Sequence, residues 1–207
     1  MKLIQAKFVG SYPSQGLALM TTIPAIAIGG RSNVGKSSLM NSLLRKKKLA
    51  QVSKAPGKTK MLNYFLVSDQ NSRELFHMVD LPGFGYARVS EETRKSWKKM
   101  VEDFIEHESQ LAGFVLLADS RRGLQSEETQ LLEYLQRHMR KTCLVLTKSD
   151  KLTKSETSKL LKETAILLSS MGLNDYFPIL HSSKNATGND LIWRWLTNLL
   201  GERLKGK

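Results

Sequence analysis

The stretch Gly30-Arg31-Ser32-Asn33-Val34-Gly35-Lys36-Ser37 decides the fold of this chain, because it fills every fixed position of the G-x-x-x-x-G-K-[ST] phosphate loop. The apolar run from Ile23 to Ile28 precedes it and is suited to a buried strand. Leucine and methionine recur at helical spacing over residues 39–44, directly after it. Strand, glycine loop and helix therefore come in the order that a nucleotide triphosphate site requires.

Each fixed residue of the loop has a mechanical task. The glycines let the backbone wrap closely, so that the N–H groups of residues 31–38, from Arg31 to Ser38, face the α- and β-phosphates at a helix N-terminus. Lys36 is expected to reach the β- and γ-oxygens, and the Ser37 hydroxyl to bind Mg²⁺. Many ATPases and kinases share this loop, so the loop alone does not identify the base.

Two further motifs follow apolar runs and are expected at strand ends. Asp80-Leu81-Pro82-Gly83 comes after residues 76–79, where Asp80 can hold Mg²⁺ through a water and the Gly83 N–H can face the γ-phosphate. Thr147-Lys148-Ser149-Asp150 closes the run that begins at Thr142. Its carboxylate can accept two hydrogen bonds from guanine, a pair that adenine does not offer, whereas the structural alternative is a helix-capping Asp.

A weaker motif, His181-Ser182-Ser183-Lys184, follows the last expected strand and suits a loop whose backbone contacts the guanine O6. Strands are expected near 23–28, 61–67, 75–79, 114–118, 142–147 and 176–180, with helices near 90–107, 126–139 and 153–171 and at the C-terminus. Ser126 is expected to cap the second of these helices. This alternation predicts a three-layer α/β/α domain with a mostly parallel six-stranded sheet plus one antiparallel strand pair.

Composition bounds the partners and the compartment. Among the 207 residues, Lys and Arg exceed Asp and Glu by 13, which favours a polyanion such as nucleic acid, although a solvated basic surface is the plainer alternative. The only cysteine, Cys143, is expected to be a buried hydrophobe, so a disulfide framework is excluded. The Leu17–Ile28 stretch is interrupted by Pro24 and two threonines, so no membrane span is expected and a cytoplasmic location follows by default.

The fine detail of the motifs resembles one family. Residues 30–39, Ala-Pro-Gly-Lys-Thr at 55–59, Asp-Leu-Pro-Gly-Phe-Gly-Tyr-Ala at 80–87 and Thr-Lys-Ser-Asp at 147–150 look like the EngB/YihA/YsxC family of bacterial GTPases, in the TrmE-Era-EngA-EngB-Septin-like superfamily. The resemblance implies a Ras-like P-loop GTPase domain over 23–202, with an N-terminal extension (1–22) that is an edge strand or partly mobile, and a basic tail (203–207). It further implies a monomeric GTP-binding protein needed for assembly of the large ribosomal subunit, and for normal cell division and septation.

The resemblance also assigns a switch segment to Gly57, Lys58, Thr59, Lys60 and Met61, with Thr59 binding Mg²⁺ in the GTP state. Two positions, Phe84 and Thr147, depart from the wider GTPase pattern. Phe84 stands where many GTPases place a water-orienting Gln, so slow turnover is expected. Thr147 replaces the usual Asn, which predicts modest guanine affinity.

Asn33 resembles the residue that helps bind K⁺ in some relatives, and the alternative is that it only supports the loop turn.

Basic clusters flank the predicted switches, which suits ribosomal RNA as the partner that senses the nucleotide state. They are residues 45–48, 54–60, 94–99, 121–122 and 137–141 with Lys205 and Lys207. Two other interpretations stay open. A nucleoside kinase would share the phosphate loop but has no use for residues 147–150, and a nucleotide-gated module in cell division would lack a direct ribosomal role.

Overall fold

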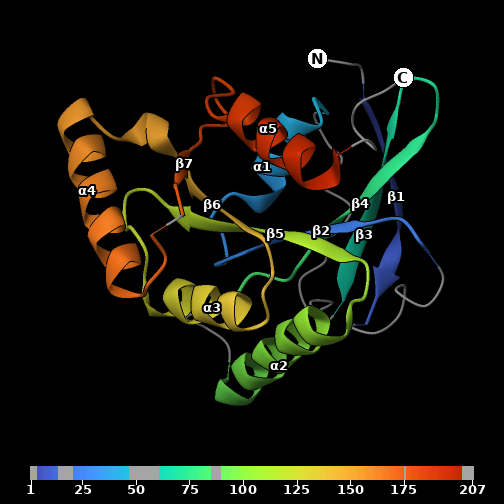
Figure 1. Ribbon diagram of the computed structural model, residues 1–207, viewed down its shortest axis with the longest axis horizontal. Helices are drawn as coiled ribbons and strands as arrows, with labels where there is room; N and C mark the ends of the chain where they lie inside the picture. The colour runs from blue at the N-terminus through green and yellow to red at the C-terminus, as the bar shows by residue number, and fades with distance from the viewer. Residues whose placement is uncertain (1–3, 14–20, 47–60, 85–89, 175, 202–207) are drawn as a thin grey trace.

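Seven strands form one mixed sheet in the computed structural model, which describes residues 4–13, 21–46, 61–84, 90–174 and 176–201 (Figure 1). Their order across the sheet is β1-β3-β4-β2-β5-β6-β7. The bounds are β1 Ile4–Tyr12, β2 Ala25–Gly30, β3 Leu62–Asp69, β4 Glu74–Asp80, β5 Leu111–Asp119, β6 Thr142–Thr147 and β7 Ile179–Leu180. Strands β4, β2, β5, β6 and β7 run parallel, and β3 is antiparallel to both β1 and β4.

Helices cover both faces of this sheet. The bounds are α1 Lys36–Leu43, α2 Glu91–His107, α3 Ser126–Arg137, α4 Lys154–Ser170 and α5 Asn189–Leu200. Helices α1 and α5 pack on one face, and α2, α3 and α4 on the other (Figure 1). The predicted three-layer α/β/α arrangement is therefore confirmed.

Strand β2 lies in the centre of the sheet and leads into the phosphate loop. All six of its residues are buried. Ile26 and Ile28 belong to the core cluster under α1 and α5, whereas Ala25 and Ala27 belong to the cluster under α2, α3 and α4. Because side chains alternate between the two faces of a strand, this apolar run fills both cores at once and anchors the loop that follows.

The predicted hairpin is present as β3 and β4. Its turn is held by the Asp69 carboxylate, which accepts hydrogen bonds from the backbone N–H groups of Asn71 and Arg73 at 2.9 and 3.0 Å. The sheet has seven strands rather than six because part of the predicted N-terminal extension forms β1, which pairs with β3 from Ile4↔Asp69 to Tyr12↔Leu62. That strand covers the edge that the hairpin would otherwise expose.

Helix ends follow local hydrogen bonding. Helix α4 is capped by Thr153, whose hydroxyl accepts from the Glu156 N–H, as the capping-box motif predicts. The prediction that Ser126 caps α3 is wrong: the cap residue is Gln125, whose N–H donates to Glu128 Oε2 at 3.1 Å. The Ser126 hydroxyl instead contacts the carboxylate of Glu127, the next residue along the chain.

Two sequence expectations concern the core and the membrane. Cys143 is buried in β6 with no disulfide partner, and burial raises the pKa of its thiol to about 12, so it behaves as a small apolar residue. Within the described ranges, no helix is long and apolar enough to cross a membrane.

Candidate functional site

The phosphate loop connects β2 to α1 through three residues with positive φ. They are Gly30 (157°), Asn33 (61°) and Gly35 (114°), the last being the cap residue of α1. A Cβ on Gly30 would lie 2.7 Å from the Leu117 carbonyl oxygen, so this position also needs glycine for close packing against β5. The loop turns sharply at these points and leads into the N-terminus of α1, which begins with Lys36 and Ser37. The free N–H groups of a helix N-terminus are suited to binding an anion.

Asp80 ends β4 beside the loop, because β4 pairs with β2 through Ile28↔Asp80. Its carboxyl group is buried, and Oδ1 has no hydrogen-bond partner among the described residues. Burial raises the pKa of Asp80, although the nearby charge of Lys36 partly offsets this rise. Burial likewise lowers the pKa of Lys36, and the charge of Asp80 partly offsets that fall. A buried carboxylate oxygen without a partner, at the strand end beside the loop that leads to Ser37, fits a Mg²⁺ ion or one of its waters.

Gly83 packs directly against the phosphate loop. A Cβ at this position would lie 2.9 Å from Ser32 Cα and 3.1 Å from Lys36 Nζ. The next residue continues the contact, since the Ser32 N–H donates to the Phe84 carbonyl oxygen at 2.8 Å. The Phe84 side chain is partly buried against the core under α2 and α3, and Leu81 and Pro82 are buried. The Asp-x-x-Gly motif therefore lies against the loop, as the sequence predicts.

The β6 motif is also joined to the phosphate loop. The Thr147 hydroxyl is buried and lies 2.6 Å from the Val34 carbonyl oxygen. Lys148 adopts a left-handed backbone conformation (φ 60°), and its ammonium group donates to the Asn33 carbonyl oxygen at 2.7 Å. Thr147 thus keeps a link to the phosphate loop even though it replaces the usual Asn.

The last two motifs meet beyond the end of β6. The Ser182 hydroxyl donates to Asp150 Oδ1 at 2.7 Å, and this hydrogen bond lowers the pKa of Asp150. The Ser149 N–H donates to the His181 carbonyl oxygen at 3.1 Å, and the Lys184 N–H donates to Ser182 Oγ at 3.2 Å. Ser183 is exposed beside them. The weak C-terminal motif therefore fixes the carboxylate that the sequence assigns to guanine.

Asp119 is the residue that sequence reasoning missed. It ends β5 in register with Thr147, and its carboxylate accepts from Lys148 at 2.8 Å and from the Arg121 guanidinium at 2.6 and 2.9 Å. Burial opposes ionisation of Asp119, but the hydrogen bonds from Arg121 and Lys148 outweigh burial and hold its pKa well below the usual range. The rule that drew attention to Asp80 and Asp150, a carboxylate at the end of an apolar strand or within three residues of it, would also have found Asp119.

The predicted switch segment is only partly within the structure. Gly57, Lys58, Thr59 and Lys60 lie outside the described residues, so the third predicted Mg²⁺ ligand has no position here. Met61 is described: it directly precedes β3 and is 47% exposed. Of the three predicted metal ligands, the structure brings Ser37 and Asp80 to the same end of the sheet.

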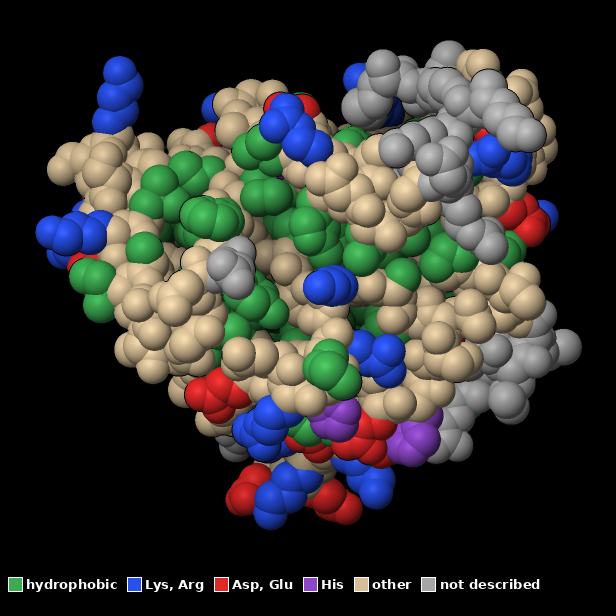
Figure 2. All heavy atoms as spheres, viewed as in Figure 1, with side chains coloured by type: hydrophobic (Ala, Val, Ile, Leu, Met, Phe, Trp, Pro, Cys, Tyr) green, Lys and Arg blue, Asp and Glu red, His purple; other side chains and the backbone are tan. Residues whose placement is uncertain are grey.

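Several of the basic clusters are engaged in local contacts. On α2, Lys95 pairs with Glu91 and Lys98 with Glu102, and on α3 Arg137 pairs with Glu133. Arg140 donates to the Ile105 carbonyl oxygen near the end of α2, which is a structural role. Figure 2 shows Lys and Arg interleaved with Asp, Glu and His along the lower edge of this face, over α2 and α3. A candidate polyanion surface is therefore better sought elsewhere.

Comparisons with known proteins agree with this geometry. Residues 25–148 match the family model described as "50S ribosome-binding GTPase". A probable GTP-binding protein EngB of Alkaliphilus metalliredigens is 40% identical over 191 residues, which cover 92% of this chain and 86% of that protein. The corresponding protein of Bacillus cereus is 37% identical over 94% of both chains.

Solved structures share the fold. The crystal structure of a probable GTP-binding protein EngB superposes with a TM-score of 0.69 at 22% identity, over 86% of this chain and 99% of that chain. The structure of Era in complex with MgGDPNP and nucleotides of 16S ribosomal RNA superposes with a TM-score of 0.64 at 18% identity, over 86% of this chain and 56% of that one. At these identities the likeness establishes the architecture alone.

Proposed function

This chain belongs to the EngB family of GTP-binding proteins, and from that membership we propose that it is a slow GTPase switch acting in assembly of the large ribosomal subunit. One observation carries the switch: the base-side motif is hydrogen-bonded to the phosphate loop through Thr147 to Val34 and Lys148 to Asn33. These hydrogen bonds fix the residues proposed to bind the base relative to those proposed to bind the phosphates. The ribosomal part is supported by the matching family model, that of a 50S ribosome-binding GTPase.

The proposed nucleotide contacts follow the chain order of the motifs. Backbone N–H groups of residues 31–38 and the Lys36 ammonium hold the phosphates. Asp150 accepts from the guanine ring, Lys148 lies over it with Thr147 and Ser149 alongside, and residues 181–184 contact O6. This assignment is supported by the Ser182 hydroxyl, which orients Asp150 through Oδ1, while Oδ2 lies 3.9 Å from Lys151 Nζ, beyond hydrogen-bond distance.

Mg²⁺ would be held by Ser37, by Asp80 and, as the resemblance implies, by Thr59. When bound, the ion neutralises charge that develops on the β- and γ-phosphate oxygens. Asp80 fits this role because its Oδ1 is buried without a partner among the described residues. The Gly83 N–H would face the γ-phosphate, and residues 57–61 would be ordered by that phosphate and released after hydrolysis.

Slow hydrolysis is proposed from the position of Phe84. Its side chain packs against the core under α2 and α3 and has no polar group to orient a water. Charge at the phosphates would then come from Lys36, Mg²⁺ and a K⁺ ion assisted by Asn33. The left-handed backbone of Asn33 (φ 61°) supports the plainer role as well, since Asn tolerates this conformation better than most residues.

The proposed partner is ribosomal RNA within a precursor of the large subunit. The net charge of +13 supports a polyanion. Era, which shares the fold over 56% of its own length, forms a complex with nucleotides of 16S ribosomal RNA. The protein would act as a cytoplasmic monomer, and normal division and septation would depend on its supply of ribosomes.

Depletion of the protein in its own cells, followed by sedimentation of ribosomal particles, tests the proposal. Large-subunit precursors are expected to accumulate, and to be cleared by the wild-type gene but not by a Lys36→Ala variant. Normal particle profiles would overturn the ribosomal role. Division defects with normal profiles would instead favour a nucleotide-gated module in division.

A further inference from the structure

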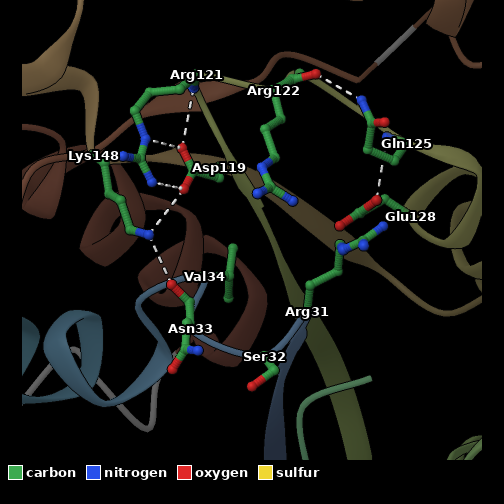
Figure 3. A pocket seen from close by; sticks show the side chains of 11 residues that line it. Arg31, Ser32, Asn33, Val34, Asp119, Arg121, Arg122, Gln125, Glu128 and Lys148 are labelled. Carbon is green, nitrogen blue, oxygen red and sulfur yellow. Dashed lines mark hydrogen bonds and ion pairs between the residues drawn. The ribbon is translucent and has the colours of Figure 1, made fainter. Parts of the chain in front are cut away.

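A pocket of about 170 Å³ lies beside the phosphate loop, on the side that faces the β5–α3 connection (Figure 3). Three segments line it: the loop at Arg31–Val34, residues 121–123 and 125 of the connection with Glu128 of α3, and Asp119 and Lys148 at the ends of β5 and β6. Asp80, Gly83, Asp150 and residues 181–184 do not line it. The pocket therefore differs from the proposed nucleotide site and shares with it the loop and Lys148.

The charges of the pocket do not cancel. Arg121 and Lys148 share the single carboxylate of Asp119, so this trio carries one excess positive charge. Arg31 pairs with Glu127 at the rim, where Nη1 and Oε2 are 2.7 Å apart. Glu128 is 1% exposed and contributes one negative charge, and its Oε2 accepts from the Gln125 N–H at 3.1 Å. With Arg122 added, the pocket is positive by at least one charge.

Arg122 is the cation that the pocket leaves uncommitted. Its carbonyl oxygen accepts from Gln125 Nε2 at 2.7 Å, but its guanidinium makes no hydrogen bond or ion pair with any residue in the described part of the chain. Figure 3 shows the side chain extending from the β5–α3 connection into the pocket, toward the phosphate loop and Arg31. A guanidinium held over a cavity can bind an oxyanion through two parallel N–H donors.

We propose that this pocket is a second anion site, in which Arg122 and Arg31 bind one phosphodiester group of an RNA partner. A phosphodiester carries a single negative charge, which matches the small positive excess of the pocket. The site rests on the proposed function, because that function supplies RNA as the partner. Asn33 and Lys148 form the wall between the two sites, so RNA bound here lies against the same loop that holds the nucleotide.

The test measures anisotropy of a fluorescein-labelled RNA hairpin of mixed sequence, titrated with the full chain saturated with GDP and Mg²⁺. Arg122→Ala is expected to weaken RNA binding by about fivefold and to reduce the slope of log K against log salt by about one. Arg122→Lys is expected to recover part of the affinity, because it restores charge without the planar fork. Arg137→Ala is the matched control, since it removes an exposed arginine from the adjacent helix α3.

The outcomes separate the inference from the proposed function. If the wild type binds RNA, and Arg122→Ala binds it with the same affinity as Arg137→Ala, the site is overturned but the RNA partner is not. Absence of RNA binding by the wild type would overturn both the site and the RNA partner. Inorganic phosphate is titrated in parallel by thermal shift: an Arg122-dependent response to phosphate without Arg122-dependent RNA binding would make this a free-phosphate site and overturn the RNA assignment. Unchanged GDP affinity and melting temperature verify that each variant is folded.

Discussion

The Lys148 ammonium lies 2.8 Å from the Asp119 carboxylate and 2.7 Å from the Asn33 carbonyl oxygen. One side chain therefore connects the ends of β5 and β6 to the phosphate loop. Arg121 donates to both oxygens of the same carboxylate, which fixes the position of the group that holds Lys148.

Replacing Asp119→Asn should loosen this connection. Hydrogen bonds to charged groups contribute about 1.5–3 kcal/mol, and an amide keeps part of them, so GDP dissociation is expected to accelerate by about tenfold. Stopped-flow release of a fluorescent GDP measures the rate. Glu133→Gln is the control, because it removes a carboxylate from a long, exposed ion pair with Arg137. Equal rates for both variants would show that Asp119 does not position Lys148.

The same carboxylate predicts a pH dependence of stability. Although burial opposes ionisation of Asp119, Arg121 and Lys148 hold its folded-state pKa below the ordinary value of about 4. The ionised group therefore stabilises the fold above about pH 4, and this stabilisation is lost as the pH falls from there toward the folded-state pKa. The difference in melting temperature between wild type and Asp119→Asn should be constant from pH 8 to 5 and shrink below pH 4. A difference that stays constant down to pH 2 would contradict the assignment.

Gly83→Ala should impair the GTP state more than the GDP state. The added methyl group would lie 2.9 Å from Ser32 Cα and 3.1 Å from Lys36 Nζ, where the γ-phosphate is expected. Single-turnover hydrolysis is expected to fall by about tenfold or more, with GDP affinity changed by less than about threefold. Gly113→Ala is the control, because its methyl group would clash with Leu199 and Trp195, away from the site. It should lower the melting temperature without changing hydrolysis per folded molecule, and similar hydrolysis in both variants would refute the proposed contact.

Asp150→Asn should change the base preference from guanine toward xanthine. An amide presents a donor where the carboxylate only accepts, and xanthine offers the matching acceptor. Competition between GTP and xanthosine triphosphate measures the preference. Ser182→Ala provides the companion variant: it removes the hydroxyl that orients Asp150 and should weaken GDP binding by about threefold without changing preference. Retained selectivity for GTP in Asp150→Asn would refute the base assignment.

The K⁺ hypothesis is tested by turnover in K⁺ and Na⁺. Wild-type hydrolysis should be faster in K⁺, and Asn33→Gly should lose the difference. Glycine is the suitable replacement because it tolerates the positive φ of 61° and keeps the carbonyl that Lys148 binds. Equal turnover of the wild type in both salts would leave Asn33 with its role in the loop turn.

Local sequence predicted the central elements well. Residues 142–147 form a buried strand with the predicted bounds, because six apolar or β-branched residues between polar neighbours fit a parallel strand covered on both faces. The capping box at Thr153 was equally easy to predict, since all its partners lie within four residues. The cap of α3 was predicted wrongly. Gln125 is the cap residue because its N–H donates to Glu128, whereas the Ser126 hydroxyl donates to Glu127.

Contacts between distant segments were harder to predict. The sequence placed Thr147, Lys148 and Asp150 near guanine, but nothing local to Asp119 indicated that it would share Lys148 with the carbonyl at Asn33, 115 residues before that lysine. Such a pairing depends on the register of β5 against β6, in which Asp119 lies opposite Thr147. Parallel strands are joined by long crossovers and not by tight turns, so no local turn signal specifies which residues lie opposite one another.

The pairing of β1 has a consequence for the order in which the molecule can be built. Strand β1 precedes every other described strand along the chain, and within the described residues it pairs with β3, from Ile4↔Asp69 to Tyr12↔Leu62. During translation, β1 would therefore gain its partner in the sheet only after β3 has emerged, so the first of the described strands is among the later ones to pair.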